Sequence, residues 1–382
     1  MAFCLLAWLA AGGFRERYEI LRNHAFALTV LLLVALIWMS TTYSVGDPGD
    51  IQRHLAKYSK LLFLPLAITL LQEERWRRCS LNAFSIAMGL TLLLSMLSLF
   101  IEIPIVKGTS GTLQGNHHVF KDHIAQNLMM AFFVLVMLVK GQDESNRGRR
   151  IGYWTVASIG IINVLGFVHG RTGYVALAAA LGIFFCFYIS PRRRIPAVVG
   201  LLIAGALMLP FAEGFRHRME AAIEEMQTHQ PEKVSSVGSR MEMAYISLEL
   251  IKERPLVGWG TGAYRTKFCE RAPVELCPLG GHPHNQFLFF TVQMGVIGLF
   301  AYIGMLAAGL SQAWRLPPRE KTLAAGLISI LIVDSLFHAP FFLVGEAQFF
   351  ILMLGVVLAQ KTAFNSKAST SFQGRSVEDR SC

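Results

Sequence analysis

Long apolar runs separated by short polar connections make up most of the 382-residue chain. A transmembrane helix needs about 20 mostly apolar residues, and these runs are continuous rather than alternating as membrane β-strands do. The runs lie near 1–13, 25–45, 58–71, 81–101, 124–139, 151–168, 172–189, 196–212, 285–311, 322–337 and 341–359. The pattern predicts an all-α integral membrane protein with about 11–12 transmembrane helices and one long helical periplasmic loop.

Composition supports this prediction, because 53% of the residues are hydrophobic and only 16% are charged. The net charge of +10 would suit a nucleic-acid-binding protein. The basic residues nevertheless fall in short clusters between apolar runs, as the positive-inside rule predicts, and no soluble nucleic-acid-binding domain is visible. We therefore expect membrane lipids, and no nucleic acid, among the partners.

Basic clusters occur in every second connection, which we place in the cytoplasm. They are Arg15/Arg17/Arg22, Arg75/Arg77/Arg78, Lys140/Arg147/Arg149/Arg150, Arg192/Arg193/Arg194 and Arg315/Arg319/Lys321. This topology puts the one long connection, 213–283, in the periplasm.

The topology divides the chain into four parts. We expect N-terminal transmembrane helices at 1–212, the periplasmic loop at 213–283, C-terminal transmembrane helices at 284–360 and a disordered cytoplasmic tail at 361–382. The first apolar run is short and has no basic residue before it, so we expect the start of the chain to lack one helix.

The long loop shows helical periodicity in two segments, at 214–229 and at about 239–251. The second begins with the capping-box pattern S-x-x-E at Ser239, which predicts Arg240 at a helix N-terminus. Cys269 and Cys277 share this loop, and the oxidising outer compartment allows either a disulfide or two free thiols.

A polar cluster precedes the apolar run at 285–311. His284 and Asn285 are followed, after nine residues, by Gly295 and Gly298, which gives H-N-x9-G-x-x-G. A neutral imidazole near its ordinary pKa of about 6.5 can accept a proton from a sugar hydroxyl. We expect the glycines to pack this helix closely on a neighbour and so hold the imidazole rigidly.

Alternatively, the same cluster could be part of a metal site, with His282 and His284 as two ligands and Cys277 or Glu275 as further ligands. No second pair of ligands at helical spacing follows. We predict no metal and no cofactor.

Arg171 lies at the outer end of an apolar run, where the topology makes arginine scarce. It either extends to lipid phosphates or binds a diphosphate, for which a guanidinium is suited. Arg240 would add a second guanidinium, unless it is an ordinary solvated charge.

Asp334 and His338, one turn apart in a late run, either line a cavity, relay a proton or form a structural contact. The glycines of the stretch from Pro255 to Tyr264 shape a turn, and without the Lys-Ser/Thr of a P-loop they do not indicate nucleotide binding.

H-N-x9-G-x-x-G, together with the P-x-x-G-x-G turn at 255–260 and Arg171, resembles the O-antigen ligase and polymerase family. The resemblance implies a metal-independent inverting glycosyltransferase of the bacterial inner membrane, with its active site facing the periplasm. Its donor would be a glycan on undecaprenyl diphosphate and its acceptor a sugar hydroxyl of lipid A-core. His284 would be the general base, and Arg171 and Arg240 would hold the diphosphate. We expect the substrate-binding residues to be Asn285, His282, Gly258, Gly260, Tyr264 and His338.

Two other functions compete with O-antigen ligation. An O-antigen or exopolysaccharide polymerase would use the same type of donor but another donor glycan as acceptor. A transporter or lipid flippase would show inverted repeats and helices broken in mid-membrane, neither of which is visible in the sequence.

Overall fold

The computed structural model describes residues 2–10, 12–112, 115–188, 190, 192 and 236–359. The expected span at 196–212, the loop helix at 214–229 and the tail at 361–382 lie outside these residues. Within the described residues the regular structure is helical and includes no strand, which confirms the predicted fold class. The α-helices are α1 (Ala2–Ala10), α2 (Phe14–Arg22), α3 (Ala25–Met39), α4 (Pro48–Tyr58), α5 (Phe63–Leu70), α6 (Glu74–Leu97), α7 (His123–Asp143), α8 (Arg147–Ile162), α9 (Arg171–Tyr188), α12 (Ser236–Glu253), α13 (Tyr264–Cys269), α14 (Gln286–Trp314), α15 (Pro318–Phe337) and α16 (Val344–Leu358).

Six helical stretches among the described residues are long and apolar enough to cross a membrane. They are Ala25–Tyr43, Glu74–Leu97, His123–Asp143, Arg147–Phe167, Arg171–Tyr188 and Gln286–Trp314. The expected span at 58–71 is instead divided into the 3-10 turn Ser59–Leu62 and the eight-residue α5. α5 alone would span about 12 Å, but α4, this turn and α5 form a helical run without a gap from Pro48 to Leu70.

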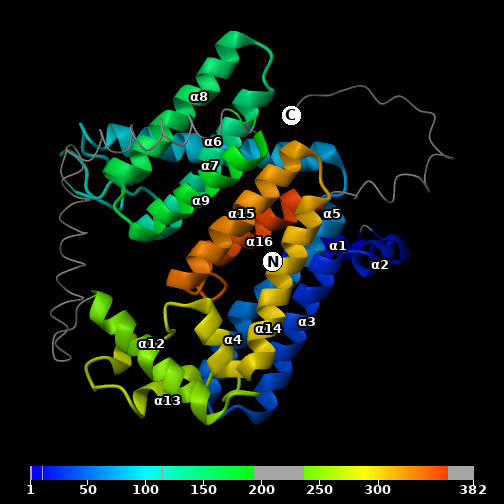
Figure 1. The fold of residues 1–382 in the computed structure, drawn as a ribbon, viewed down its shortest axis with the longest axis vertical. Coiled ribbons are helices and arrows are strands. Elements are labelled where there is room, and N and C mark those ends of the chain that lie inside the picture. The colour runs from blue at the N-terminus through cyan, green and yellow to red at the C-terminus, as the bar shows by residue number, and fades with distance from the viewer. Residues whose placement is uncertain are drawn as a thin grey trace.

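α7 is the most buried of the long apolar helices, and α8, α9 and α15 cover most of its surface (Figure 1). α14 packs against α3 and α15, and α16 packs against α5 and α15. In Figure 1, α12 and α13 lie with α4 at the lower end of the molecule, beside the lower parts of α3 and α14.

Basic connections that the charge pattern assigned to one side of the membrane meet at one end of the helices. Arg78, Lys140 and Arg319 line a single cavity of about 440 Å³, together with Asp143 and Glu144. This end is called the paired end below, because Arg78 bonds Glu74 at 2.5 Å and Arg319 lies 3.8 Å from Asp143.

α14 is broken, contrary to the expected rigid helix. Gly295 has φ 62° and ψ −159°, and a Cβ there would lie 2.2 Å from the backbone of Leu256. This glycine therefore accommodates the loop backbone and a left-handed conformation, rather than helix–helix packing. A Cβ at Gly298 would likewise lie 2.5 Å from Met294 of its own helix.

The loop turn at 255–260 fills the break. The Trp259 and Gly260 N–H groups donate to the Val292 and Gln293 carbonyls at 2.9 and 2.8 Å, and the Val296 N–H donates to the Pro255 carbonyl at 2.8 Å. Irregular backbone within a membrane protein is tolerated where protein satisfies its polar groups. The broken helix thus locks the long loop to α14.

Candidate active site at the start of α14

His284 has a left-handed backbone, with φ 52°, and lies two residues before α14. Asn285 caps the helix, because its Oδ1 accepts the Leu288 N–H at 2.9 Å. The Asn285 side-chain amide also donates to the Leu336 carbonyl at 3.1 Å. Asn285 therefore joins the start of α14 to the end of α15 and fixes the backbone that carries the imidazole.

Three histidine rings gather here. The His284 ring centroid lies 4.3 Å from that of His282 and 6.1 Å from that of His338. The backbone N–H of His284 donates to His282 Nδ1 at 3.2 Å. Nδ1 of His284 is buried and has no hydrogen-bond partner in the described part of the chain. A buried imidazole nitrogen without a partner is a free position for a substrate proton.

Burial lowers the pKa of His284 to about 4, with further lowering by the charges of Arg240 and His338. Burial likewise lowers the pKa of His282 to about 3, and the neighbouring charges of His284 and His338 add to it. The expected pKa near 6.5 is therefore wrong for the unliganded site. His284 is neutral at pH 7, and a bound anion would raise its pKa because a negative charge favours the imidazolium.

Two guanidinium groups interact electrostatically with one another, and one of them, that of Arg240, also acts on His282 and His284. Arg171 is the first residue of α9 and is exposed, whereas Arg240 in α12 is partly buried. Burial, and then the charge of Arg171, lower the pKa of Arg240. Neither guanidinium has an ion-pair partner among the residues that the structure describes. The two like charges are left uncompensated.

The helix around Arg240 begins earlier than the capping box predicts. α12 is already helical at Ser236, so Ser239 does not cap it and Arg240 is its fifth residue. The first four N–H groups of a helix lack intrahelical partners, and Arg240 is beyond them. Arg171, as the first residue of α9, has the helix-start position instead.

Behind His338 lie two buried carboxyl groups. His338 Nδ1 and Asp334 Oδ1 are 2.9 Å apart, and ligand atoms of Asp334, His338 and Glu346 all lie within 4.8 Å of one another. This group could share a proton or hold a cation. Sequence reasoning identified Asp334 and His338 but missed Glu346, although a lone acid in the last apolar run was a visible signal.

Lys57 of α4 is a second residue that sequence reasoning missed. Its charge is among those that lower the pKa of His282, after burial, His284 and His338. The signal was hidden because α4 lies in a stretch interpreted as an ordinary connection.

Three further predicted site residues have packing roles in this structure. Gly258 and Gly260 have φ of 66° and 92°, and a Cβ would lie 2.5 Å from the Val292 oxygen and 2.2 Å from Ser44 Cα, respectively. Tyr264 is fully buried, and its ring stacks on Phe268 at 5.7 Å. Substrate binding by these three residues stays a prediction.

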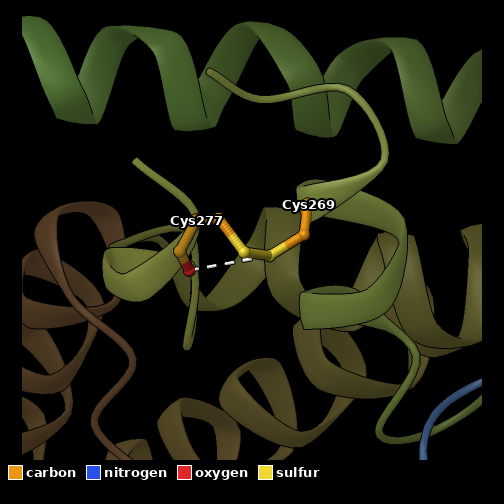
Figure 2. Close-up of a disulfide and its surroundings, with 2 residues drawn as sticks. All are labelled: Cys269 and Cys277. Atoms are coloured by element: carbon orange, nitrogen blue, oxygen red, sulfur yellow. Dashed lines mark hydrogen bonds between the residues drawn. A yellow bond between two sulfur atoms is a disulfide. The ribbon is translucent and has the colours of Figure 1, made fainter. Parts of the chain in front are cut away.

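A disulfide joins Cys269, the last residue of α13, to Cys277 (Figure 2). Of the two alternatives left by the sequence, pairing is therefore correct. The bond closes the segment five residues before His282, and it removes Cys277 as a thiolate ligand from the metal-site alternative.

The fold and site define a polytopic helical membrane protein with an imidazole cluster and two uncompensated guanidinium groups. Residues 156–303 match the family model described as O-antigen ligase. This range runs from α8 into α14 and includes Arg171, Arg240 and His284. The match agrees with the resemblance seen in the sequence.

No curated protein matches the chain. Among solved structures, a chain described under "Structural coordination of polymerization and crosslinking by a peptidoglycan synthase complex" is 16% identical, with a TM-score of 0.48. That similarity covers 87% of this chain and 95% of the other.

Proposed function

We propose that the protein transfers O-antigen glycan en bloc from undecaprenyl diphosphate to a sugar hydroxyl of lipid A-core. The observation that carries this proposal is a chain of interactions: the charge of Arg171 acts on Arg240, and that of Arg240 acts on His284, whose buried Nδ1 has no partner among the described residues. A diphosphate leaving group needs positive charge, and an attacking hydroxyl needs a base. The site offers both.

In the proposed reaction, His284 Nδ1 takes the proton of the acceptor hydroxyl. The acceptor oxygen forms a bond to the anomeric carbon while the bond to the diphosphate oxygen breaks, so a single displacement inverts the anomeric configuration. Arg171 and Arg240 neutralise the departing diphosphate, as charge-assisted pairs do for phosphates. Because donor binding brings negative charge toward His284, it raises the pKa of the imidazole when a stronger base is needed.

The arginines allow the reaction to proceed without a metal ion, since two guanidinium groups supply the positive charge that a divalent cation supplies in metal-dependent enzymes. The N-terminal position of Arg171 in α9 adds backbone N–H groups to the same anion site. Opposite placement of this site and the paired end supports a periplasmic active site in the inner membrane.

A polymerase remains the alternative, because it would use the same donor and the same catalytic groups on another donor glycan. The transporter hypothesis gains one feature, the break of α14 at Gly295. That break is filled by the backbone of the loop turn at 255–260, whereas the broken helices of transporters expose backbone groups to the transported ion or substrate. This filling supports a fixed scaffold for a transferase.

The test is deletion of the gene, followed by gel analysis of lipopolysaccharide and complementation with the wild type or His284→Ala. Ligase function requires bare core in the deletion strain, accumulation of lipid-linked glycan, and rescue by the wild type alone. Core carrying a single repeat would establish a polymerase instead. Normal ladders with altered solute uptake would establish a transporter.

A further inference from the structure

Basic side chains form a stripe along α4 and the turn that follows it. Arg53, Lys57 and Lys60 are separated by four and three residues, the spacing that puts side chains on one helical face. His54 and Tyr58, on the adjacent face of the helix, are buried in the core. The three residues are called the basic stripe below.

The basic stripe lies where the topology makes basic residues scarce. It follows the candidate span Ala25–Tyr43, on the side of the membrane that the charge pattern assigns to the periplasm. Tyr43 and Val45, just before α4, are exposed, as expected for side chains at a membrane surface. The stripe is thus at the level of lipid head groups.

Two of its three charges have no acidic partner. Arg53 forms an ion pair with Asp50 at 2.8 Å. Within the described ranges, no ion pair joins Lys57 or Lys60 to a carboxylate. Lys57 Nζ instead lies 3.4 Å from the ring centroid of Phe342, an arrangement that stabilises a cation but does not neutralise it.

Phe342 connects this ammonium group to the imidazole cluster. Its ring centroid is 5.7 Å from that of His282, and the charge of Lys57 reaches His282. Burial, and then the charges of Arg53 and Lys60, lower the pKa of Lys57. An anion bound at the stripe would relieve this repulsion.

The charges that act on the histidines come from two groups of basic residues. Arg171 acts on Arg240, and Arg240 acts on His284. Lys57 acts on His282, on which Arg240 acts as well. A diphosphate bound at Arg171 and Arg240 would not give Lys57 or Lys60 an acidic partner, which leaves a place for a second anion.

We propose that the basic stripe binds a phosphate group of the acceptor lipid. This proposal rests on the proposed function, which assigns the donor diphosphate to Arg171 and Arg240 and brings an acceptor hydroxyl to His284. The acceptor approaches along the membrane surface, where α4 lies. A phosphate held at Lys57 would orient the acceptor toward the imidazole cluster through a charge-assisted hydrogen bond. The stripe would thereby select phosphorylated acceptors.

The test measures binding of lipid A to the purified full-length protein in detergent, independently of glycan transfer. The probes are lipid A with its phosphates and lipid A from which they have been removed. Lys57→Ala should weaken binding of the phosphorylated probe by about 10- to 100-fold, the usual range for loss of a hydrogen bond to a charged group. Binding of the dephosphorylated probe should not change. Lys57→Arg should retain binding, because it keeps the charge.

The matched control is Lys252→Ala, which removes an exposed lysine at the end of α12 and should change nothing. In transfer assays, Lys57→Ala should raise KM for the acceptor by the same factor and leave KM for the donor unchanged. A raised donor KM would move Lys57 into the donor site and overturn the proposal.

A further measurement compares binding of the wild type and Lys57→Ala to vesicles that contain phosphatidylglycerol. If Lys57→Ala weakens binding to these vesicles as much as binding to lipid A, the stripe is a general contact for anionic lipid and the proposal is wrong. Failure of the proposed function has a different signature, because wild-type protein would then transfer no glycan. The two lipid A probes would still decide whether the stripe recognises phosphate.

Discussion

The two arginines of the candidate site and the arginines of the paired end differ in their partners. At the paired end, Arg78 bonds Glu74, Arg149 lies 3.3 Å from Glu144 and Arg319 lies 3.8 Å from Asp143. At the other end, which holds the candidate site and is called the site end below, Arg171 and Arg240 have no carboxylate partner in the part of the chain that the structure describes. Both ends carry basic residues, although those of the paired end are more numerous, so the partner of each side chain is the informative difference.

The difference lies in where the counter-charge comes from. Exposed ion pairs contribute little stability, and at the paired end they serve a topological role that any Lys or Arg fills. Two neighbouring guanidinium groups without an acid repel each other, which costs stability unless an anion joins them. The comparison therefore indicates that the site end is organised for a ligand, whereas the paired end is complete without one.

The largest expected effect is at His284. His284→Ala and His284→Gln should each lower the glycan transfer rate by about 100- to 10,000-fold, the usual loss when a positioned base is removed. Glutamine keeps hydrogen bonding but cannot accept the proton. Single-turnover transfer from lipid-linked donor to lipid A-core, with protein level checked by blotting, measures this loss.

EDTA should leave wild-type transfer unchanged, which separates the base from a metal ligand. Near-wild-type transfer by His284→Gln would exclude the base role and assign the imidazole to positioning. Asn285 is not a suitable control, because it caps α14.

The next effect compares the arginines of the two ends directly. Arg171→Ala and Arg240→Ala should each lower transfer by about 10- to 100-fold, because a hydrogen bond to a charged group contributes roughly 1.5–3 kcal/mol. Lysine should restore only part of the rate, since it cannot form the bidentate contact. The same transfer assay, with donor KM determined for each variant, measures the effect.

Arg319→Ala is the matched variant at the paired end, where an exposed pair with Asp143 is lost. Its transfer rate should stay within a factor of two or three, as expected for surface ion pairs. Arg265→Ala, an exposed arginine in α13, controls for loss of charge on the loop itself. Equal losses at both ends would remove the distinction between them.

A third, smaller effect concerns how α14 joins the two ends. Gly295→Ala should destabilise the protein by roughly 2 kcal/mol or more, because alanine disfavours positive φ and its Cβ would meet the Leu256 backbone. In the regular half of the same helix, the Cβ added by Gly304→Ala would have no neighbouring atom within 4 Å. It should be neutral or stabilising by up to about 1 kcal/mol. Thermal unfolding in detergent compares the two variants.

Sequence reasoning found the helical class and the resemblance to O-antigen ligases because both rest on local patterns. Apolar runs reveal membrane helices without tertiary information, and H-N-x9-G-x-x-G needs no structure to be read. It failed where a residue's conformation depends on a distant partner. Gly295 is left-handed because the loop turn at 255–260 packs against it, 35 to 40 residues earlier in the chain.

In the candidate site, too, residues with a local sequence pattern were found and residues that depend on distant neighbours were missed. His284 and the two arginines were identified from motif and topology, whereas Lys57 and Glu346 were missed. Neither has a motif, and both matter through neighbours that only folding brings near: Phe342 for Lys57, and Asp334 with His338 for Glu346. The pKa of His284 was misjudged for the same reason, since burial is a property of the packed state.

The smallest expected effect is a change in the pH dependence of transfer. The acid limb of kcat/KM reports the free-enzyme pKa of the base, which for His284 is about 4. Wild-type kcat/KM should therefore stay level from pH 7 to about pH 5 and fall only as His284 is protonated near its pKa. Because the pKa in the folded protein is below the unfolded value of about 6.5, the unfolded chain takes up this proton first. The contribution of His284 to stability should then decrease as pH falls from about 6.5 to about 4.

Arg240→Ala sharpens this prediction, since its charge is the second cause of the lowered pKa after burial. Removing that charge should move the acid limb to higher pH, but not fully to 6.5, because the imidazole stays buried. Arg240→Lys keeps a positive charge and should leave the limb close to its wild-type position, as should Arg265→Ala. The measurement is kcat/KM against pH for the four proteins, each normalised to its own value at pH 7. An Arg240→Ala limb that coincides with the wild type would show that this charge does not reach His284, and the anion site and the base would then have to be assigned separately.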